Sequence, residues 1–264
     1  MYYIGLDAGS TTTKAVLCTE DKIVAKYLLP TAGDPKGAMH TVLDHFTKQY
    51  GPYDYLITTG YGRKLLPADL VITEITCHGR GAEYLHPGIT QVIDIGGQDC
   101  KTIQLNGKGG VLDFNMNDRC AAGTGRFVEV MMKTLGEDID ILDDFVADAT
   151  PVKINSMCTV FAESEVVSLV AKGTPRENIA LGVLNSIAKR IKGQYIKLQP
   201  KHGSPILFTG GLSRSKAFAK VLKSIVDAPI YRDDLGQYAG AIGAAQIGLK
   251  KLQPKVTPTT ANQR

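Results

Sequence analysis

Hydrophobic and polar positions alternate as strands and turns in the first part of the chain. Apolar residues on both sides of a Gly/Ser/Thr-rich turn over residues 2–19 predict two strands, and residues 23–30 predict a third. Apolar residues at four-residue spacing predict a helix over Lys36–Gln49, and a second helix is expected near Ile75–Tyr84. Another strand, turn and strand are expected over residues 90–105.

After about Asn117, most apolar residues recur at the spacing that is typical of helices. A long core-facing helix is predicted from apolar residues in four-residue steps, which are Ile179, Val183, Ile187, Ile191 and Tyr195. A strand, a Gly-Gly turn and a helix are expected over residues 204–225, with Ser213 as a candidate cap. A Gly- and Ala-rich helix suited to close packing follows over residues 236–252. This order of elements indicates an α/β fold, and we expect two similar lobes with a cleft between them.

We expect the two lobes to divide near residue 115. Residues 1–115 would then form the N-terminal lobe, with two of the glycine turns, and residues 116–252 the C-terminal lobe. Residues 253–264 contain two prolines and no apolar stripe, so we expect this tail to be disordered.

Composition excludes several classes of protein. The chain has 264 residues, of which 44% are hydrophobic, enough for substantial cores. Its net charge is +4, and the Lys and Arg residues are interspersed with Asp and Glu, so we expect no nucleic-acid partner. No apolar run approaches the roughly eighteen residues that span a bilayer, and no charged leader precedes MYYIGLDAGS. We therefore expect a cytoplasmic protein with no membrane partner.

Two of the five cysteines stand at predicted helix starts. Cys120 and Cys158 each precede a run with helical apolar spacing. A helix N-terminus offers unpaired N–H groups and a partial positive charge, which lower the pKa of a thiol and suit a thiolate bound to iron. The alternative is a pair of buried structural cysteines. The odd cysteine count argues against a disulfide framework, and Cys18 and Cys100 are interpreted as packing residues. Cys77 is next to His78, but adjacent ligands rarely converge on one ion, so this pair is not interpreted as a metal site.

One turn occurs twice in the sequence. Residues 7–14 (DAGSTTTK) and 94–101 (DIGGQDCK) share the form Asp, any residue, Gly, four residues, Lys, each after an apolar strand. A Gly-Gly pair at 210–211 gives a third glycine turn. Each alone is typical of an ordinary tight turn, but together they predict a phosphate cradle of backbone N–H groups, with strand-end aspartates placed to hold a cation. No GxxxxGK[ST] or GxGxxG motif is present, so neither a Walker nor a Rossmann site is supported.

These motifs resemble those of a known superfamily. GLDAGSTTTK and VIDIGGQDCK are similar to the two phosphate motifs, ILFTGGLSRS to the adenosine motif and GQYAGAIGAA to the second connecting helix of the actin, Hsp70 and sugar-kinase superfamily. DIGGQD, NDRCAAGTGRF and CTVFAESEV more specifically resemble the BadF/BadG/BcrA/BcrD-type ATPases, in particular the activator component of 2-hydroxyacyl-CoA dehydratases. The resemblance implies a two-lobed actin-like ATPase, which is a duplicated ribonuclease-H-like fold with a central nucleotide cleft.

The resemblance implies an ATPase that drives one-electron transfer. ATP hydrolysis would be coupled to low-potential electron transfer into a 2-hydroxyacyl-CoA dehydratase or a related double-cluster reductase, with ferredoxin or flavodoxin as donor. An oxygen-sensitive 4Fe-4S cluster would lie at the interface of a homodimer, held by Cys120 and Cys158 of each subunit. Two thiolates per chain are half of the four that such a cluster requires, and a two-fold axis supplies the others.

The resemblance also assigns roles around ATP and Mg²⁺. Asp7 and Asp94 would bind Mg²⁺ through water, and Gln98 would orient the attacking water. The implied nucleotide contacts are Ser10, Thr11, Thr12, Thr13, Lys14 and Gly97 for the phosphates, and Gly210, Gly211 and Gln237 for the adenosine side. Lys101 repeats the spacing of Lys14, but it is omitted from the predicted site because a strand-end salt bridge explains it equally well.

A small-molecule kinase, for example of the N-acetylhexosamine type, is the alternative within the same superfamily. It would need an Asp as general base between the second phosphate motif and the next helix, and Asp113 and Asp118 lie in that interval. Asp118 adjoins the Cys120 motif, which favours the ATPase. A non-catalytic nucleotide-dependent scaffold is the weakest hypothesis, because Gln98 and both strand-end aspartates are present.

Overall fold

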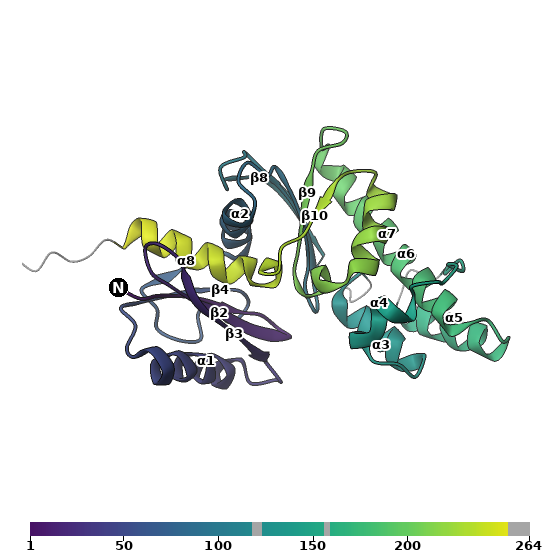
Figure 1. The fold of residues 1–264 in the computed structure, drawn as a ribbon, viewed down its shortest axis with the longest axis horizontal. Helices are drawn as coiled ribbons and strands as arrows, with labels where there is room; N and C mark the ends of the chain where they lie inside the picture. Colours follow the sequence, from purple (N-terminus) through teal and green to yellow (C-terminus); the bar gives the residue numbers. More distant parts are fainter. Residues whose placement is uncertain (118–122, 156–158, 253–264) are drawn as a thin grey trace, which may run out of the picture.

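Two five-stranded mixed sheets form the framework of the fold (Figure 1). The structure is a computed structural model that describes residues 1–117, 123–155 and 159–252. The first sheet has the order β3-β2-β1-β4-β5, and its strands are β1 (Tyr3–Ala8), β2 (Thr12–Cys18), β3 (Ile23–Pro30), β4 (Tyr55–Thr59) and β5 (Leu70–Val71). The second has the order β10-β9-β6-β7-β8, and its strands are β6 (Gln91–Ile95), β7 (Cys100–Leu105), β8 (Val111–Asn117), β9 (Ile206–Thr209) and β10 (Ile230–Tyr231).

The two sheets are copies of one arrangement. β1 pairs antiparallel with β2 and parallel with β4, and β6 pairs in the same way with β7 and β9. In the β1–β2 hairpin Asp7 lies opposite Lys14, and in the β6–β7 hairpin Asp94 lies opposite Lys101. The repeated spacing in the sequence therefore reflects one hairpin register used twice, and the predicted duplication and α/β class are confirmed.

The helices cover both sheets. They are α1 (Pro35–Tyr50), α2 (Glu74–Leu85), α3 (Gly125–Thr134), α4 (Leu142–Phe145), α5 (Thr159–Ala171), α6 (Arg176–Tyr195), α7 (Lys216–Val226) and α8 (Ala239–Lys251). α1 buries Met39, Val42 and Phe46 against the first sheet. The largest core lies between the second sheet and α3, α5, α6 and α7, and it contains all five apolar residues from which the long helix was predicted. No helix among the described residues is long and apolar enough to cross a membrane.

Backbone contact between α2 and α8 joins the two halves (Figure 1). A side chain at Gly243 of α8 would collide with the carbonyl oxygen of Cys77, and one at Gly81 of α2 would collide with that of Ala239. On its other side α8 lies against β1, where a side chain at Gly5 would meet the carbonyl of Ala241. The close packing predicted for the Gly- and Ala-rich helix is therefore present.

Some details differ from the sequence-based predictions. Ser215, rather than Ser213, caps α7 by accepting a hydrogen bond from the Phe218 backbone N–H, because Ser213 lies within the preceding 3₁₀ turn. Strand β8 was not predicted. The expected lobe boundary at residue 115 falls within β8, so the second sheet takes strands from both sides of it, and that division stays a prediction. The tail 253–264 lies outside the described residues.

Substitution of Gly243 by Ala is expected to destabilise the protein by about 1–3 kcal/mol, because the added methyl group would force the backbones of α2 and α8 apart. The matched control is Gly193→Ala in α6, where a Cβ would meet nothing within 4 Å. That change is expected to stabilise by about 0.5–1 kcal/mol through helix propensity. Urea denaturation measures both, and equal shifts in the unfolding midpoint would contradict the prediction.

Candidate functional site

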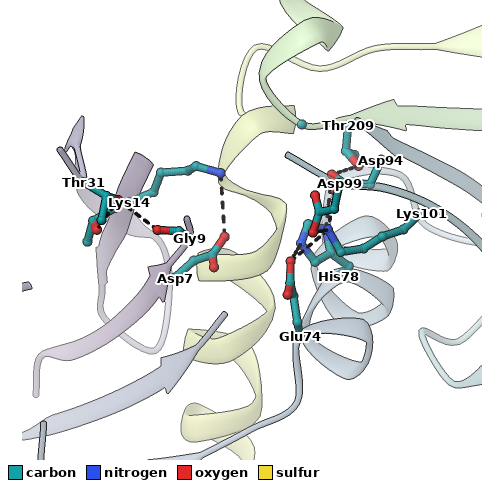
Figure 2. A network of polar contacts seen from close by, with 12 residues as sticks. Asp7, Gly9, Lys14, Thr31, Glu74, His78, Asp94, Asp99, Lys101 and Thr209 are labelled. Carbon is teal, nitrogen blue, oxygen red and sulfur yellow. Dashed lines mark hydrogen bonds and ion pairs between the residues drawn. The ribbon is translucent and has the colours of Figure 1, made fainter. Parts of the chain in front are cut away.

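The strand-end aspartates of the two central hairpins are buried and line one small space, each within its own group of polar contacts (Figure 2). Asp7 is in β1 and Asp94 is in β6, and each is paired with the Lys opposite it. The Lys14 Nζ lies 3.7 Å from Asp7 Oδ2, and the Lys101 Nζ lies 3.3 Å from Asp94 Oδ2. The two copies of the hairpin thus bring their aspartate–lysine pairs together at the junction of the two sheets.

Asp94 has partners on both carboxylate oxygens. The Thr209 hydroxyl donates to Oδ1 at 2.8 Å, His78 Nδ1 lies 3.4 Å from the same oxygen, and Lys101 donates to Oδ2. Burial alone would raise the pKa of Asp94, but the charges of His78 and Lys101 hold that pKa below its usual range. Asp94 is therefore a fully satisfied, ionised group.

Asp7 differs from its counterpart. Burial raises its pKa, and the Lys14 ammonium opposes that rise only in part. Its Oδ1 is buried and makes no hydrogen bond to the described residues. A buried carboxylate oxygen without a partner costs free energy, so it fits a position next to a hydrated cation. The residues present are thus suited to Mg²⁺ at Asp7.

The three glycine turns line one cavity of about 350 Å³. Its wall includes Thr11, Thr12, Lys14, Gly96, Gly97, Gly211, Leu212 and Arg214. A smaller adjoining space touches Asp7, Ser10, Asp94 and Gly210, and it also has Lys14 in its wall. Gly96, Gly97 and Gly211 line this wall without side chains, so a phosphate can approach the backbone closely, and Lys14 adds a positively charged side chain. The cavity therefore fits a nucleotide.

Glycine is required where the turns approach each other. A Cβ at Gly97 would collide with the Thr11 side chain, so the first and second turns meet at this point. Gly210 has φ +85°, which favours glycine, and a Cβ there would collide with the backbone of Ile95. Close contact between the turns thus depends on the absence of side chains.

Three predicted site residues lie outside these two spaces. Thr13 is buried, and its hydroxyl is 3.1 Å from that of Thr31. Gln98 is exposed in the turn between β6 and β7. Gln237 lines a separate polar pocket of about 260 Å³ together with Arg232. Their assigned roles stay predictions, as do those of the residues that line the cavity.

The second turn is joined to the start of α3. The backbone N–H of Gly125 donates to the Gly96 carbonyl, and that of Arg126 donates to the Gly97 carbonyl, both at 2.9 Å. The first N–H groups of a helix have no partner within the helix, so the turn satisfies two of them. α3 in turn packs against α5 and α6.

The two cysteines predicted to bind iron, Cys120 and Cys158, lie outside the described residues. Cys18, Cys77 and Cys100 are buried, and burial raises the pKa of each thiol to about 12. Cys18 and Cys100 were predicted as packing residues, and their burial agrees with that interpretation. Cys100 begins β7 rather than lying in the turn as expected. Among the described ranges, no group of three or more His, Cys, Asp or Glu side chains is arranged to hold a metal ion.

Sequence reasoning missed much of the network around Lys101. Glu74, His78 and Asp99 were not predicted to be site residues, and Lys101 was omitted. Glu74 and His78 are four residues apart on α2, with the His78 Nε2 at 3.7 Å from Glu74 Oε1. This i, i+4 spacing is the only sequence signal for them, and it is common on helices.

The candidate base of a kinase lies away from the cavity. Asp113 is exposed on β8, its Oδ1 accepts a hydrogen bond from the Phe114 backbone N–H, and it lines none of the spaces described above. Asp118 lies outside the described residues.

Comparison with known proteins places the chain in a family. The model of the BadF/BadG/BcrA/BcrD ATPase family matches residues 4–248. The chain is 46% identical to protein YjiL of Escherichia coli K12 over 248 residues, which cover 94% of this chain and 96% of that protein. It is 38% identical to the (R)-2-hydroxyglutaryl-CoA dehydratase activating ATPase of Acidaminococcus fermentans over 261 residues, which cover 95% and 98%.

A solved structure agrees with these relatives. The activator of the 2-hydroxyisocaproyl-CoA dehydratase from Clostridium difficile, with bound ADPNP, has a TM-score of 0.86 and 34% identity, covering 95% of each chain. The predicted fold and family are therefore confirmed. The chain belongs to the BadF/BadG/BcrA/BcrD ATPase family.

Proposed function

We propose that the protein is an ATP-dependent activator of a 2-hydroxyacyl-CoA dehydratase or a related double-cluster reductase. It hydrolyses ATP in the cavity between the glycine turns and couples hydrolysis to transfer of one electron to the partner enzyme. Two of the relatives described above are named as dehydratase activators, and one of them was solved with an ATP analogue.

On the nucleotide side, the chain's own groups bind and orient the phosphates. The Lys14 ammonium pairs with phosphate oxygens, and the backbone N–H groups of the first two turns, with the hydroxyls of residues 10–13, surround them. Asp7, assisted by Asp94, holds Mg²⁺ through water, and Gln98 orients the attacking water. Gly210 and Gly211 face the adenosine, and Gln237 approaches it from the segment before α8.

The observation that carries the coupling is the attachment of the Cys120 stretch to the second phosphate hairpin. At one end, Asn117 is the strand partner of Cys100 at the start of β7. At the other end, the N–H of Gly125 is bonded to the carbonyl of Gly96. Both ends of the stretch are therefore anchored on the hairpin that lines the nucleotide cavity, so a change in that hairpin acts on both anchors.

On the redox side, we propose a homodimer in the cytoplasm that holds one 4Fe-4S cluster through Cys120 and Cys158 of each subunit. The thiols of Cys18, Cys77 and Cys100 are buried with raised pKa values, which leaves these two as the cluster ligands. When bound, the cluster supplies a one-electron carrier of low potential, charged by ferredoxin or flavodoxin. Such a centre makes the protein oxygen-sensitive.

The kinase alternative is less well supported. A general base must reach the hydroxyl that attacks the γ-phosphate, and the exposed Asp113 does not line the cavity. An ATP-dependent phosphorylation of N-acetylhexosamines by iron-free protein would reverse this order of preference.

Replacement of Lys14 by Met is expected to weaken ADPNP binding by about 10- to 100-fold, because a charge-assisted contact to the phosphates is lost. The control is Lys220→Met on α7, an exposed lysine that lines none of the three spaces. Isothermal titration in the presence of Mg²⁺ measures both affinities. Equal affinities in the two variants would show that Lys14 does not meet the phosphates.

Anaerobically purified protein is expected to contain roughly two iron atoms per chain, because one 4Fe-4S cluster is shared by two subunits. Cys120→Ser and Cys158→Ser should each abolish iron binding, since every cluster would lose two thiolates. Cys18→Ala serves as the control and should retain iron. Iron and acid-labile sulfide analyses provide the readout, and iron-free wild-type protein after reconstitution would refute the cluster assignment.

The activity itself is tested with a purified 2-hydroxyacyl-CoA dehydratase, reduced ferredoxin and ATP under anaerobic conditions. We expect dehydration of the acyl-CoA only when ATP and the protein are both present. The Cys120→Ser variant should still bind ADPNP but should fail to activate the dehydratase. Activation by this variant would separate the activity from the cysteines and contradict the proposal.

A further inference from the structure

The two copies of the aspartate–lysine pair have different surroundings. The side chain of Lys14 is 14% exposed and lines both the nucleotide cavity and the adjoining space. That of Lys101 is 1% exposed, and it lines the smaller adjoining space but not the larger cavity. Equivalent register positions therefore place Lys14 in the wall of both spaces and Lys101 in the wall of the smaller one.

Lys101 is enclosed by three carboxylates (Figure 2). Its Nζ lies 2.7 Å from Asp99 Oδ2, 2.9 Å from Glu74 Oε1 and 3.3 Å from Asp94 Oδ2. Asp94 and Asp99 are buried and Glu74 is partly exposed, and three carboxylates this close would repel one another without a cation, so the ammonium offsets their mutual repulsion. We call these four side chains the Lys101 cage.

The cage spans the second phosphate turn. Asp94 is the penultimate residue of β6 and Asp99 is the last residue before β7, so the ammonium bonds to both sides of the Gly96–Gly97 pair. The turn is closed by a hydrogen bond from the Gly96 N–H to the Asp99 carbonyl at 3.0 Å. Glu74 contributes from the first turn of α2 and connects this hairpin to the helix that packs on α8.

From this geometry we propose that Lys101 is a positioning residue for the proposed ATP site, which fixes the Gly96–Asp99 turn, and with it Gln98, in the shape needed for hydrolysis, while Lys14 is the duplicated lysine that meets the phosphates. The proposal rests on the proposed ATPase function, and it gives Lys101 a task that the repeated motif does not reveal. Because the Lys101 ammonium is bound by three carboxylates, it acts by holding the turn and not by contacting the nucleotide.

Charge balance and positioning make different predictions, and a double variant separates them. Lys101→Met leaves Asp94, Asp99 and Glu74 without the cation that they share and is expected to lower the Tm strongly. Lys101→Met combined with Glu74→Gln removes one positive and one negative charge, so the cage regains its original net charge. Simple charge balance would then restore every property of the protein, whereas positioning would not, since Asp94 and Asp99 still lack their common partner.

The measurements are the Tm, the kcat for ATP, the affinity for ADPNP, and amide hydrogen exchange of nucleotide-free protein in residues 94–101. In the double variant we expect the Tm to recover, exchange in this segment to be about tenfold faster than in the parent, and exchange in α7 to be unchanged. The kcat should fall about 100-fold, because the groups of the turn would no longer be held in the geometry needed for hydrolysis, while the affinity for ADPNP should change by less than about threefold. Lys14→Met should show the opposite split, with weakened affinity and unchanged exchange in residues 94–101.

Asp99→Asn provides a second route if the lysine variants do not fold. It keeps the shape of the side chain and retains Lys101, but removes the charge at the shortest contact, and it should also accelerate exchange in residues 94–101. Parent-like exchange in Asp99→Asn, or in the folded double variant, would overturn the proposal, and so would recovery of kcat together with the Tm. A parent protein that neither binds ADPNP nor hydrolyses ATP would refute the proposed function instead, while the exchange rates still decide the role of Lys101.

Discussion

The backbone-to-backbone packing of α2 on α8 sets the separation of the two sheets, and the rest of the site depends on it. α8 lies against β1, and α2 lies against β7 and β8, so this one helix pair joins the two copies of the hairpin. At Gly240, a Cβ would come within 2.8 Å of Asp7 Oδ2 and 3.2 Å of His78 Nε2. Larger residues along this contact would separate the two aspartates and widen the small space that both of them line.

Both aspartates are buried at this junction, so the charge of each has to be compensated by groups of the protein or of a ligand. Asp94 obtains two hydrogen-bond donors and a nearby imidazole, whereas Asp7 obtains one distant ammonium. A buried carboxylate persists only with such compensation. The two hairpins thus keep the same backbone register but differ in their polar contacts. Asp94 of the second hairpin is stabilised by side chains of the protein, whereas Asp7 of the first hairpin has an oxygen suited to a ligand.

Features determined by local pattern were predictable from the sequence. The hairpins, the long helix α6 and the burial of Cys18 followed from apolar spacing and turn residues. Strand β8 was missed although Leu112, Phe114 and Met116 alternate with polar residues in the sequence, as is typical of a strand. The structure places β8 at the edge of the second sheet with these three apolar side chains exposed, Leu112 by 65%.

The site was predictable only in part. The three glycine turns were found because glycine is required where they meet, but Glu74 and His78 were not, since their role depends on how close α2 comes to β6 and β7. Lys101 was seen and set aside, because spacing alone gives no information about burial. Cys120 and Cys158, the most specific part of the resemblance, lie outside the described residues.

The two hydrogen bonds from α3 to the second turn have a mechanical consequence. A helix behaves as a stiff rod over its length, and α3 has its first two N–H groups fixed to the Gly96 and Gly97 carbonyls. A small rotation of the Gly96–Gly97 peptides would therefore tilt α3. The displacement would be largest at the C-terminal end of the helix, where the Thr134 hydroxyl lies 3.5 Å from Glu163 Oε1 of α5. Under the proposed function, a change at the bound phosphates would therefore pass through α3 to α5, the helix that follows Cys158, within one half of the molecule and without a separation of the two sheets.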